Sequence, residues 1–285
     1  MGGYKYTTPP GGLLSGSLAA VINRPEFNNA PLSAAAIGYD VDTGAPYYID
    51  IARAPHVLIA GTTGSGKSVT MHDIIISLIY KNTPATAEFY LIDPKMIELS
   101  LYENIPLVKR CDFTPAAALA TLATLHNDMM KRYKAMRRAG VRTITGSDYK
   151  RVYIFIDEIA DLMFTNKKDT EKYISSIARL GRAAGFHIIA ATQRPTRDVL
   201  TGQIKINMPA RIALAMPAAV DSVTVLGHKG AETLKGRGDA LIKTGDSINI
   251  NHIQCAYISG DEIRHITEYC ERQAPRRRGI FKKAV

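Results

Sequence analysis

With 285 residues, 46% of them hydrophobic, the chain is long enough to bury a sizeable core as one large domain or two small ones. Lys and Arg outnumber Asp and Glu by 36 to 26, and this excess favours an anionic partner such as nucleic acid or a membrane surface. Three distant cysteines without a C-x-x-C pair argue against a disulfide scaffold, and the lack of a membrane-length apolar run or a secretory signal favours a cytoplasmic protein.

The first 54 residues predict a flexible leader followed by a small mixed segment. Residues 1–16 are rich in Gly, Thr and Pro, as flexible leaders are. Within residues 17–54, a short apolar stretch predicts a helix that ends near Pro25, because the residue before a proline disfavours the helical conformation. Two further runs, 37–41 and 47–51, flank Asp42-Thr43-Gly44, a pattern typical of a β-hairpin.

Residues 56–71 carry the strongest pattern in the chain, H-V-L-I-A-G-T-T-G-S-G-K-S-V-T-M. A short apolar run predicts a buried strand, G-x-x-x-x-G-K-S predicts a phosphate-binding loop, and the apolar stretch 69–80 predicts a helix. Glycines let the backbone N–H groups face phosphate oxygens, and the helix N-terminus adds its positive end. We expect the loop to bind ATP through Thr62, Thr63, Gly64, Ser65, Gly66, Lys67, Ser68 and Val69.

Two side chains of this loop have specific expected roles. Lys67 would reach the β- and γ-phosphates, and the Ser68 hydroxyl would bind Mg²⁺. The alternative is a glycine-rich turn that only caps a helix. We favour the phosphate loop because the motif and its strand–loop–helix context agree.

The rest of the chain alternates predicted strands and helices, which indicates an α/β fold with a mostly parallel sheet covered on both faces. The predicted strands are 87–92, 151–156, 186–191, 210–214, and a closing hairpin of 239–243 and 248–257. The predicted helices are 115–139, 168–184 and 260–272. Residues 273–285 form a basic tail, which is either a solvated end or a binding arm.

Polar side chains follow two of these strands. Asp157 and Glu158 come directly after strand 151–156, where Asp157 would hold Mg²⁺ beside Ser68 and Glu158 would orient the attacking water. An acidic pair could instead serve only the start of a helix. Thr192 and Gln193 end strand 186–191, where Gln193 could sense the γ-phosphate or make a simple strand-end hydrogen bond.

Taken together, these motifs resemble the motor domain of FtsK/SpoIIIE-type DNA translocases. The resemblance runs from about Pro25 to Tyr269 and rests on H-V-L-I-A-G-T-T-G-S-G-K-S-V, L-I-D-P-K-M-I-E-L-S-L-Y, F-I-D-E-I-A-D-L-M, A-R-L-G-R-A-A-G-F-H, A-T-Q-R-P and G-A-E-T-L-K-G-R-G-D-A. It implies a RecA-like P-loop ATPase that assembles as a hexameric ring around double-stranded DNA. Residues 55–272 would be the motor, and 17–54 the end of the small domain that precedes it.

The resemblance also implies roles for three basic residues. Arg182, in G-R-A-A-G, matches the arginine that the family presents to a neighbour's ATP, although it could simply be a helix-end arginine. Arg194 and Lys205 match basic positions near the DNA-facing loops, where phosphate contacts would be independent of sequence and sensitive to salt.

Several departures from the family pattern bear on these expectations. The usual S-K-x-D-S-R reads 218–223 A-A-V-D-S-V here, so that Ala219 and Val223 replace two cations, for which Lys229 could compensate. The family's membrane region and winged-helix DNA reader have no counterpart, so a bare motor is expected. Two other functions stay open: a conjugation or secretion ATPase that moves a protein or nucleoprotein, and a ring that binds ATP structurally with little turnover.

Overall fold

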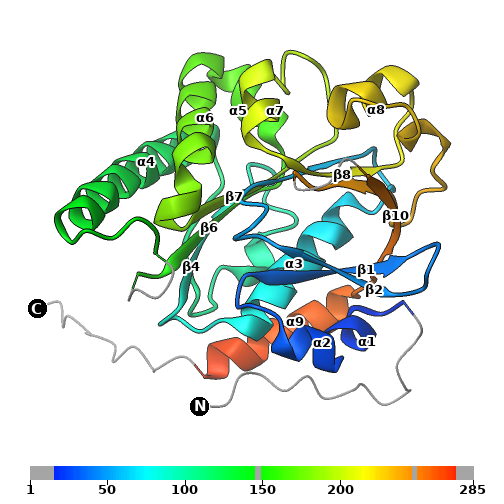
Figure 1. The fold of residues 1–285 in the computed structure, drawn as a ribbon, viewed down its shortest axis with the longest axis horizontal. Coiled ribbons are helices and arrows are strands. Elements are labelled where there is room, and N and C mark those ends of the chain that lie inside the picture. The colour runs from blue at the N-terminus through cyan, green and yellow to red at the C-terminus, as the bar shows by residue number, and fades with distance from the viewer. Residues whose placement is uncertain (1–15, 145–148, 246–248, 274–285) are drawn as a thin grey trace, which may run out of the picture.

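The computed structural model describes residues 16–144, 149–245 and 249–273 (Figure 1). The predicted leader, apart from Gly16, and the predicted basic tail, apart from Gln273, lie outside the described residues. None of the helices in the described part of the chain has both the length and the apolar character needed to cross a membrane.

The described strands form one ten-stranded sheet in the order β2-β1-β10-β9-β8-β3-β7-β6-β4-β5. The six strands from β8 to β5 run parallel, and the four from β2 to β9 continue the sheet in antiparallel fashion. Their bounds are β1 Ala34–Asp40, β2 Pro46–Asp50, β3 Val57–Ala60, β4 Ala87–Ile92, β5 Val108–Asp112, β6 Arg151–Ile156, β7 Phe186–Thr192, β8 Ala210–Leu214, β9 Asp239–Lys243 and β10 Ile250–Cys255.

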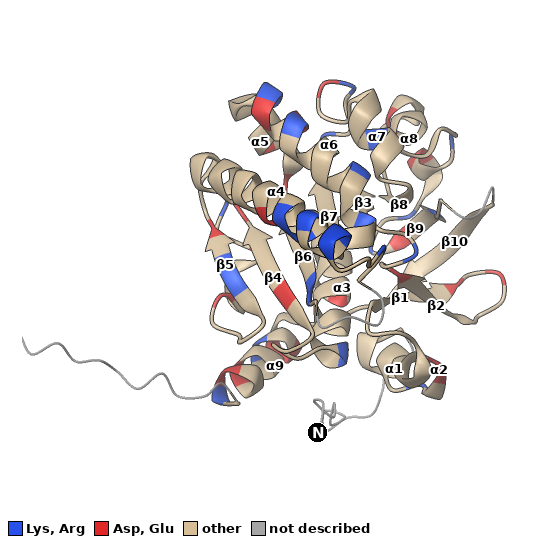
Figure 2. Cartoon of the chain, turned by 60° about the vertical axis from the view of Figure 1, so that its left-hand side comes forward, with Lys and Arg blue, Asp and Glu red and all other residues tan. Residues whose placement is uncertain are grey.

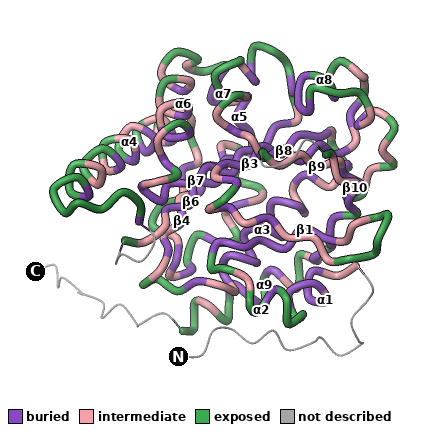
Figure 3. The backbone as a smooth tube through the Cα atoms, viewed as in Figure 1, coloured by how far each residue is buried: buried purple, intermediate pink, exposed green. Residues whose placement is uncertain are grey.

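Helices cover both faces of this sheet, as the alternation of strands and helices predicts (Figures 1 and 3). The α-helices are α1 Leu18–Ile22, α2 Pro25–Asn29, α3 Lys67–Lys81, α4 Pro115–Arg138, α5 Ile159–Thr165, α6 Lys167–Ala184, α7 Gly202–Asn207, α8 Ala219–Leu226 and α9 Gly260–Arg272, with short 3-10 turns at Ser100–Tyr102 and Ala231–Thr233.

Strand β6 shows how the sheet separates two hydrophobic cores. Tyr153 and Phe155 point into a core shared with α3, α1 and α9, whereas Ile154 and Ile156 point into a core shared with α4, α5, α6, α7 and α8. Successive residues of a strand face opposite sides, so a run that is apolar throughout is suited to a strand buried on both faces.

The N-terminal segment pairs with β10, near the end of the described chain. β1 lies between β2 and β10, with Tyr39 opposite Gln254, and the Ala256 N–H donates to the Ile37 carbonyl at 2.7 Å. At Gly38 an added Cβ would lie 2.0 Å from the Gln254 oxygen, so this pairing needs glycine there. The predicted hairpin of the N-terminal segment is therefore confirmed, and it extends the same sheet that carries the phosphate loop.

The structure differs from the predicted elements mainly where elements are short or exposed. Pro25 begins a second helix, α2, because proline suits the first helical turn. The edge strand β5 was not predicted, since it carries the exposed Lys109 and Arg110 in place of an apolar run. The helices α5, α7 and α8 have only 7, 6 and 8 residues and were also missed.

Candidate functional site

The phosphate loop lies at the carboxyl end of β3, in the middle of the parallel strands between β7 and β8. All four residues of β3 are buried, and α3 begins at Lys67 directly after Gly66. Gly64 and Gly66 have φ of 79° and 107°, which is the left-handed region that glycine adopts at little cost. The strand–loop–helix arrangement predicted from the sequence is confirmed.

A second glycine segment supports this loop from the side. The Gly238 N–H donates to the Ser65 carbonyl at 2.8 Å, and a Cβ added at Gly66 would lie 2.6 Å from the Gly238 nitrogen. Arg237, just before it, is exposed and has a positive φ of 53°. Sequence reasoning noted the G-R-G-D motif but gave it no role, whereas the structure packs it against the phosphate loop.

Lys67 reaches the acidic pair at the end of β6. Its Nζ lies 2.9 Å from the backbone oxygen and 2.9 Å from Oδ1 of Asp157, and both side chains are about 5% exposed or less. β6 is two strands away from β3, so only the tertiary fold brings these residues together. The site thus joins an ammonium group, a carboxylate and the N-terminal end of a helix, a combination suited to phosphates and a divalent cation.

Glu158 is held by the end of β7. Its carboxylate accepts hydrogen bonds from the Thr192 hydroxyl at 2.6 Å, the Gln193 N–H at 2.9 Å and the Ala160 N–H at 3.2 Å, the last of which caps α5. The Gln193 side chain in turn accepts from the Thr63 hydroxyl at 3.1 Å. The fold therefore connects Glu158, through Gln193, to the tip of the phosphate loop.

The candidate site also contains Glu98, which was not among the site residues predicted from the sequence. Its carboxylate lies 3.3 Å from Nε2 of His72 in α3, and hydrogen bonds from His72 and then Ser68 lower the Glu98 pKa. Buried Asp93 fixes the loop that carries Glu98, because its carboxylate accepts from the N–H groups of Lys95, Glu98 and Leu99. The D-P-K-M-I-E motif thus places a second carboxylate beside the predicted Mg²⁺ ligand Ser68.

Arg182 lies at the opposite end of the sheet from the phosphate loop. It sits in the last turn of α6, just before β7, whereas Gln193 follows the end of β7. The 7 residues of β7 span roughly 20 Å. Gly181 before it packs against β7, since an added Cβ would lie 2.4 Å from the Phe186 oxygen, and Gly185 ends the helix with φ of 74°. The structure does not bring Arg182 to the nucleotide site of its own chain.

Arg194 and Lys205 lie beyond the end of β7, Arg194 directly after Gln193 and Lys205 in α7. Arg194 is exposed, and its guanidinium lies 5.8 Å from the ring centre of Phe164, which is itself 59% exposed. Lys205 is half-buried in α7, one position before the exposed Ile206.

In α8, Val223 is exposed and Ala219 half-buried, while Lys229 lies exposed just after the helix. Lys and Arg also gather along the last turns of α4 (Figure 2).

Comparison with known proteins places these features in one family. The sequence profile described as FtsK/SpoIIIE family matches residues 17–153 and 146–197. DNA translocase FtsK of Clostridium acetobutylicum is 41% identical over 271 residues, which cover 90% of this chain and 35% of that protein. The Campylobacter jejuni protein of the same name is 39% identical over 269 residues, covering 90% and 28%. The chain therefore spans about a third of the length of such relatives.

Solved structures agree on the fold. A structure of the pCW3 conjugation coupling protein TcpA with ATPgS has a TM-score of 0.75 at 28% identity, covering 87% of this chain and 72% of that one. The cytoplasmic domain of the type VII secretion ATPase EccC of Thermomonospora curvata also has a TM-score of 0.75, at 22% identity, over 90% of this chain and 34% of that one. The likeness to EccC shows the fold alone. With its RecA-like P-loop fold and a profile match across most of its length, this chain belongs to the FtsK/SpoIIIE family.

Proposed function

We propose that this chain is an ATP-hydrolysing ring motor that moves double-stranded DNA without sequence specificity. The observation that supports this most strongly is the meeting of Lys67, Asp157, Glu158 and Gln193 at one end of the sheet. These residues come from three strand ends, and their chemistry matches the needs of phosphoryl transfer to water.

We assign nucleotide binding to residues 62–69. Their backbone N–H groups and the start of α3 would hold the phosphates, and Lys67 would bind the β- and γ-phosphates. Because the Lys67 ammonium group contacts the Asp157 carboxylate, it is held where Asp157 and Glu158 adjoin the phosphate loop. The buried environment strengthens these charge interactions relative to water.

The oxygen ligands present suit Mg²⁺. Ser68 supplies a hydroxyl and Asp157 a carboxylate, with the Glu98 carboxylate near Ser68, and hard oxygen ligands are those that Mg²⁺ prefers. When bound, Mg²⁺ would neutralise charge on the phosphate oxygens. Ser68 and Asp157 are the residues we assign to hold it.

Glu158 and Gln193 would act on the attacking water. The carboxylate of Glu158 is fixed by Thr192 and by the backbone of Gln193, so its position depends on the end of β7. We propose that Glu158 accepts a hydrogen bond from the water, while Gln193 responds to the γ-phosphate through its contact with Thr63.

Arg182 would act on the nucleotide of a neighbouring subunit. Two different surfaces, the phosphate loop on one end of the sheet and Arg182 on the other, would meet in a head-to-tail interface, and such an interface forms a ring when the rotation between subunits closes. We propose a hexameric ring of cytoplasmic subunits, as in the family, with residues 55–272 as the motor.

DNA contacts are assigned to Arg194 and Lys205. Both lie beyond the end of β7, and the excess of Lys and Arg over the whole chain favours a polyanionic track. Contacts to phosphates alone would not discriminate between sequences. DNA-stimulated ATP hydrolysis tests the whole proposal.

The second candidate is a motor for conjugation, whose cargo is a protein–DNA complex. It is favoured by the likeness to TcpA, a conjugation coupling protein, at 28% identity and a TM-score of 0.75. ATPase activity that responds to a partner protein of a conjugation machine and not to naked duplex DNA would select this candidate.

A further inference from the structure

One side of α3 presents two polar side chains to the loop that follows β4. Ser68 and His72 are four positions apart in this helix, so they lie one turn from each other on the same face. From the loop, the Glu98 carboxylate lies 3.3 Å from Nε2 of His72. Hydrogen bonding to His72, and then to Ser68, lowers the Glu98 pKa, so an ionised carboxylate lies between these two side chains at neutral pH.

The two partners of His72 indicate where its ring hydrogen lies. The ionised Glu98 carboxylate can only accept, so Nε2 carries the hydrogen and donates it. In the neutral imidazole Nδ1 then accepts, and it lies 2.9 Å from the hydroxyl of fully buried Tyr102. Burial raises the pKa of Tyr102, so its hydroxyl keeps the hydrogen that it donates. The imidazole is therefore held at both of its nitrogens, which fixes the side that it presents to Glu98.

The backbone that carries Glu98 is fixed as well. The carboxylate of buried Asp93 accepts hydrogen bonds from the N–H groups of Glu98 at 3.0 Å and Leu99 at 2.9 Å. Leu99 and Tyr102 belong to the hydrophobic core that is shared with α3. Glu98 thus reaches α3 from a segment that is anchored on both sides, while its own side chain remains 32% exposed beside the phosphate loop.

We infer that Glu98 is a positioning residue for Mg²⁺, which accepts the hydrogen of the Ser68 hydroxyl and so turns the Ser68 oxygen toward the cation. His72 and Tyr102 hold the carboxylate in place for this role. The inference rests on the proposed ATPase and adds to it a group that acts through Ser68. A hydroxyl that binds a cation uses an oxygen lone pair, and its hydrogen then needs an acceptor on another side. Loss of such an outer partner of a metal ligand costs roughly 10–100-fold in metal affinity.

The first measurement is the affinity of the chain, bound to a non-hydrolysable ATP analogue, for Mn²⁺ in place of Mg²⁺. Electron paramagnetic resonance gives this affinity from the signal of free Mn²⁺. Glu98→Gln should weaken Mn²⁺ binding by roughly tenfold, because glutamine offers one acceptor oxygen in place of two. Tyr102→Phe keeps the ring and the charge of Glu98, and should weaken Mn²⁺ binding by a smaller factor. Affinity for the analogue in EDTA should stay at the wild-type value in both variants.

Glu103→Gln is the matched control. Glu103 is exposed on the same segment, directly after the turn that holds Tyr102, so its replacement removes a carboxylate away from the contact between His72 and Glu98. This variant should bind Mn²⁺ like the wild type. Wild-type Mn²⁺ affinity in Glu98→Gln or Tyr102→Phe, with or without a lower melting temperature, would overturn the inference, since a purely structural role changes stability alone.

A cycle of single and double variants tests whether Glu98 acts through Ser68. Ser68→Ala removes the hydroxyl, so Glu98→Gln should have little further effect in that background. The double variant should therefore bind Mn²⁺ about as weakly as Ser68→Ala alone. Losses that add in full would make Glu98 an independent ligand of the cation and contradict the inference.

The result of these measurements is separate from that for the proposed function, because Mn²⁺ affinity is measured without hydrolysis and without DNA. If wild-type protein shows DNA-stimulated ATP hydrolysis while Glu98→Gln binds Mn²⁺ normally, the inference fails and the proposed function stands. If Glu98→Gln binds Mn²⁺ roughly tenfold more weakly than the wild type while DNA leaves hydrolysis unchanged, the inference stands and the proposed function fails.

Discussion

Lys67 and Asp157, 90 positions apart in the chain, form a buried ion pair in which the ammonium group contacts both the side chain and the backbone of the aspartate at 2.9 Å. The pair joins the phosphate loop to the end of β6 across the intervening strand β7. It also means that the residue expected to bind phosphates contributes to the stability of the fold.

Lys67→Ala should therefore abolish ATP turnover and also lower the free energy of unfolding, by roughly 3 kcal/mol, because Asp157 would keep a buried charge without its partner. Chemical denaturation and ATPase assays measure the two effects. The double variant Lys67→Ala, Asp157→Asn should recover much of the stability but none of the activity. Full activity in Lys67→Ala would remove this residue from the mechanism.

Glu158→Gln should leave nucleotide binding intact while hydrolysis falls by roughly two orders of magnitude or more, because the amide is a poor base. The single oxygen of the glutamine can still accept from the Thr192 hydroxyl and the Ala160 N–H, while the hydrogen bond from the Gln193 N–H is lost, so most of the contacts that hold the end of β7 should be retained. Binding of a fluorescent ATP analogue and single-turnover hydrolysis separate the two effects. Hydrolysis close to the wild-type rate would contradict the assigned role.

Stability should fall as the pH drops below about 6.5, because two buried histidines are neutral in the fold. Burial lowers the pKa of His187 to about 4, from an ordinary value of 6.5, and burial also lowers the pKa of His56. A depressed histidine pKa gives stability that is present above the unfolded pKa and is lost as pH falls toward the folded one. For His187 the difference amounts to roughly 3 kcal/mol.

Melting temperatures between pH 7.5 and pH 4 will measure this effect. His187→Phe should flatten the pH dependence while lowering stability throughout, since the hydrogen bond from its Nδ1 to the Pro55 carbonyl at 3.0 Å is lost. An equally steep slope in His187→Phe would show that other groups cause the acid lability.

Arg194→Ala and Lys205→Ala should weaken DNA binding to all sequences alike. Each contact to a phosphate releases counterions, so each variant should also flatten the dependence of affinity on salt, by about one unit of slope per contact for each subunit engaged. Fluorescence anisotropy with two duplexes of unrelated sequence over a range of salt concentrations measures both effects. Loss of binding to only one of the duplexes would contradict a phosphate-only interface.

The sequence predicted the centre of the fold because its signals there are local. The phosphate loop combines a buried strand, glycines and a helix within 16 residues, and Asp157 and Glu158 follow an uninterrupted apolar strand. Such patterns depend only on neighbours in the chain. The strands β4, β6, β8 and β9 accordingly have the bounds that were predicted.

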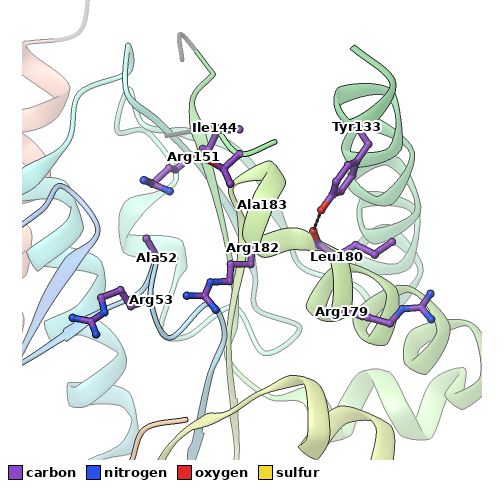
Figure 4. Close-up of a pocket in the computed structure, with 10 residues that line it drawn as sticks. Ala52, Arg53, Tyr133, Ile144, Arg151, Arg179, Leu180, Arg182 and Ala183 are labelled. Atoms are coloured by element: carbon purple, nitrogen blue, oxygen red, sulfur yellow. Dashed lines mark hydrogen bonds between the residues drawn. The ribbon is translucent and has the colours of Figure 1, made fainter. Parts of the chain in front are cut away.

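The rest of the site depends on contacts between distant segments. Glu98 reaches Ser68 only because Asp93 folds the intervening loop with three backbone hydrogen bonds. Gly238 supports the phosphate loop from more than 170 positions away, and nothing local to it signals that contact. Arg53, Arg151 and Arg182 line one pocket (Figure 4) because they lie at or just before the starts of three strands that run parallel, β3, β6 and β7, and this pairing of distant segments has no local signal.

The most direct test of the central proposal is the ATPase rate of the intact chain with and without double-stranded DNA at low salt. The proposed ring motor predicts that duplex DNA of any sequence raises the rate and that the increase fades as salt rises, because the contacts are to phosphates. Equal rates with and without duplex DNA, together with no retention of the DNA by the protein, would contradict the proposed translocase function and favour the conjugation motor.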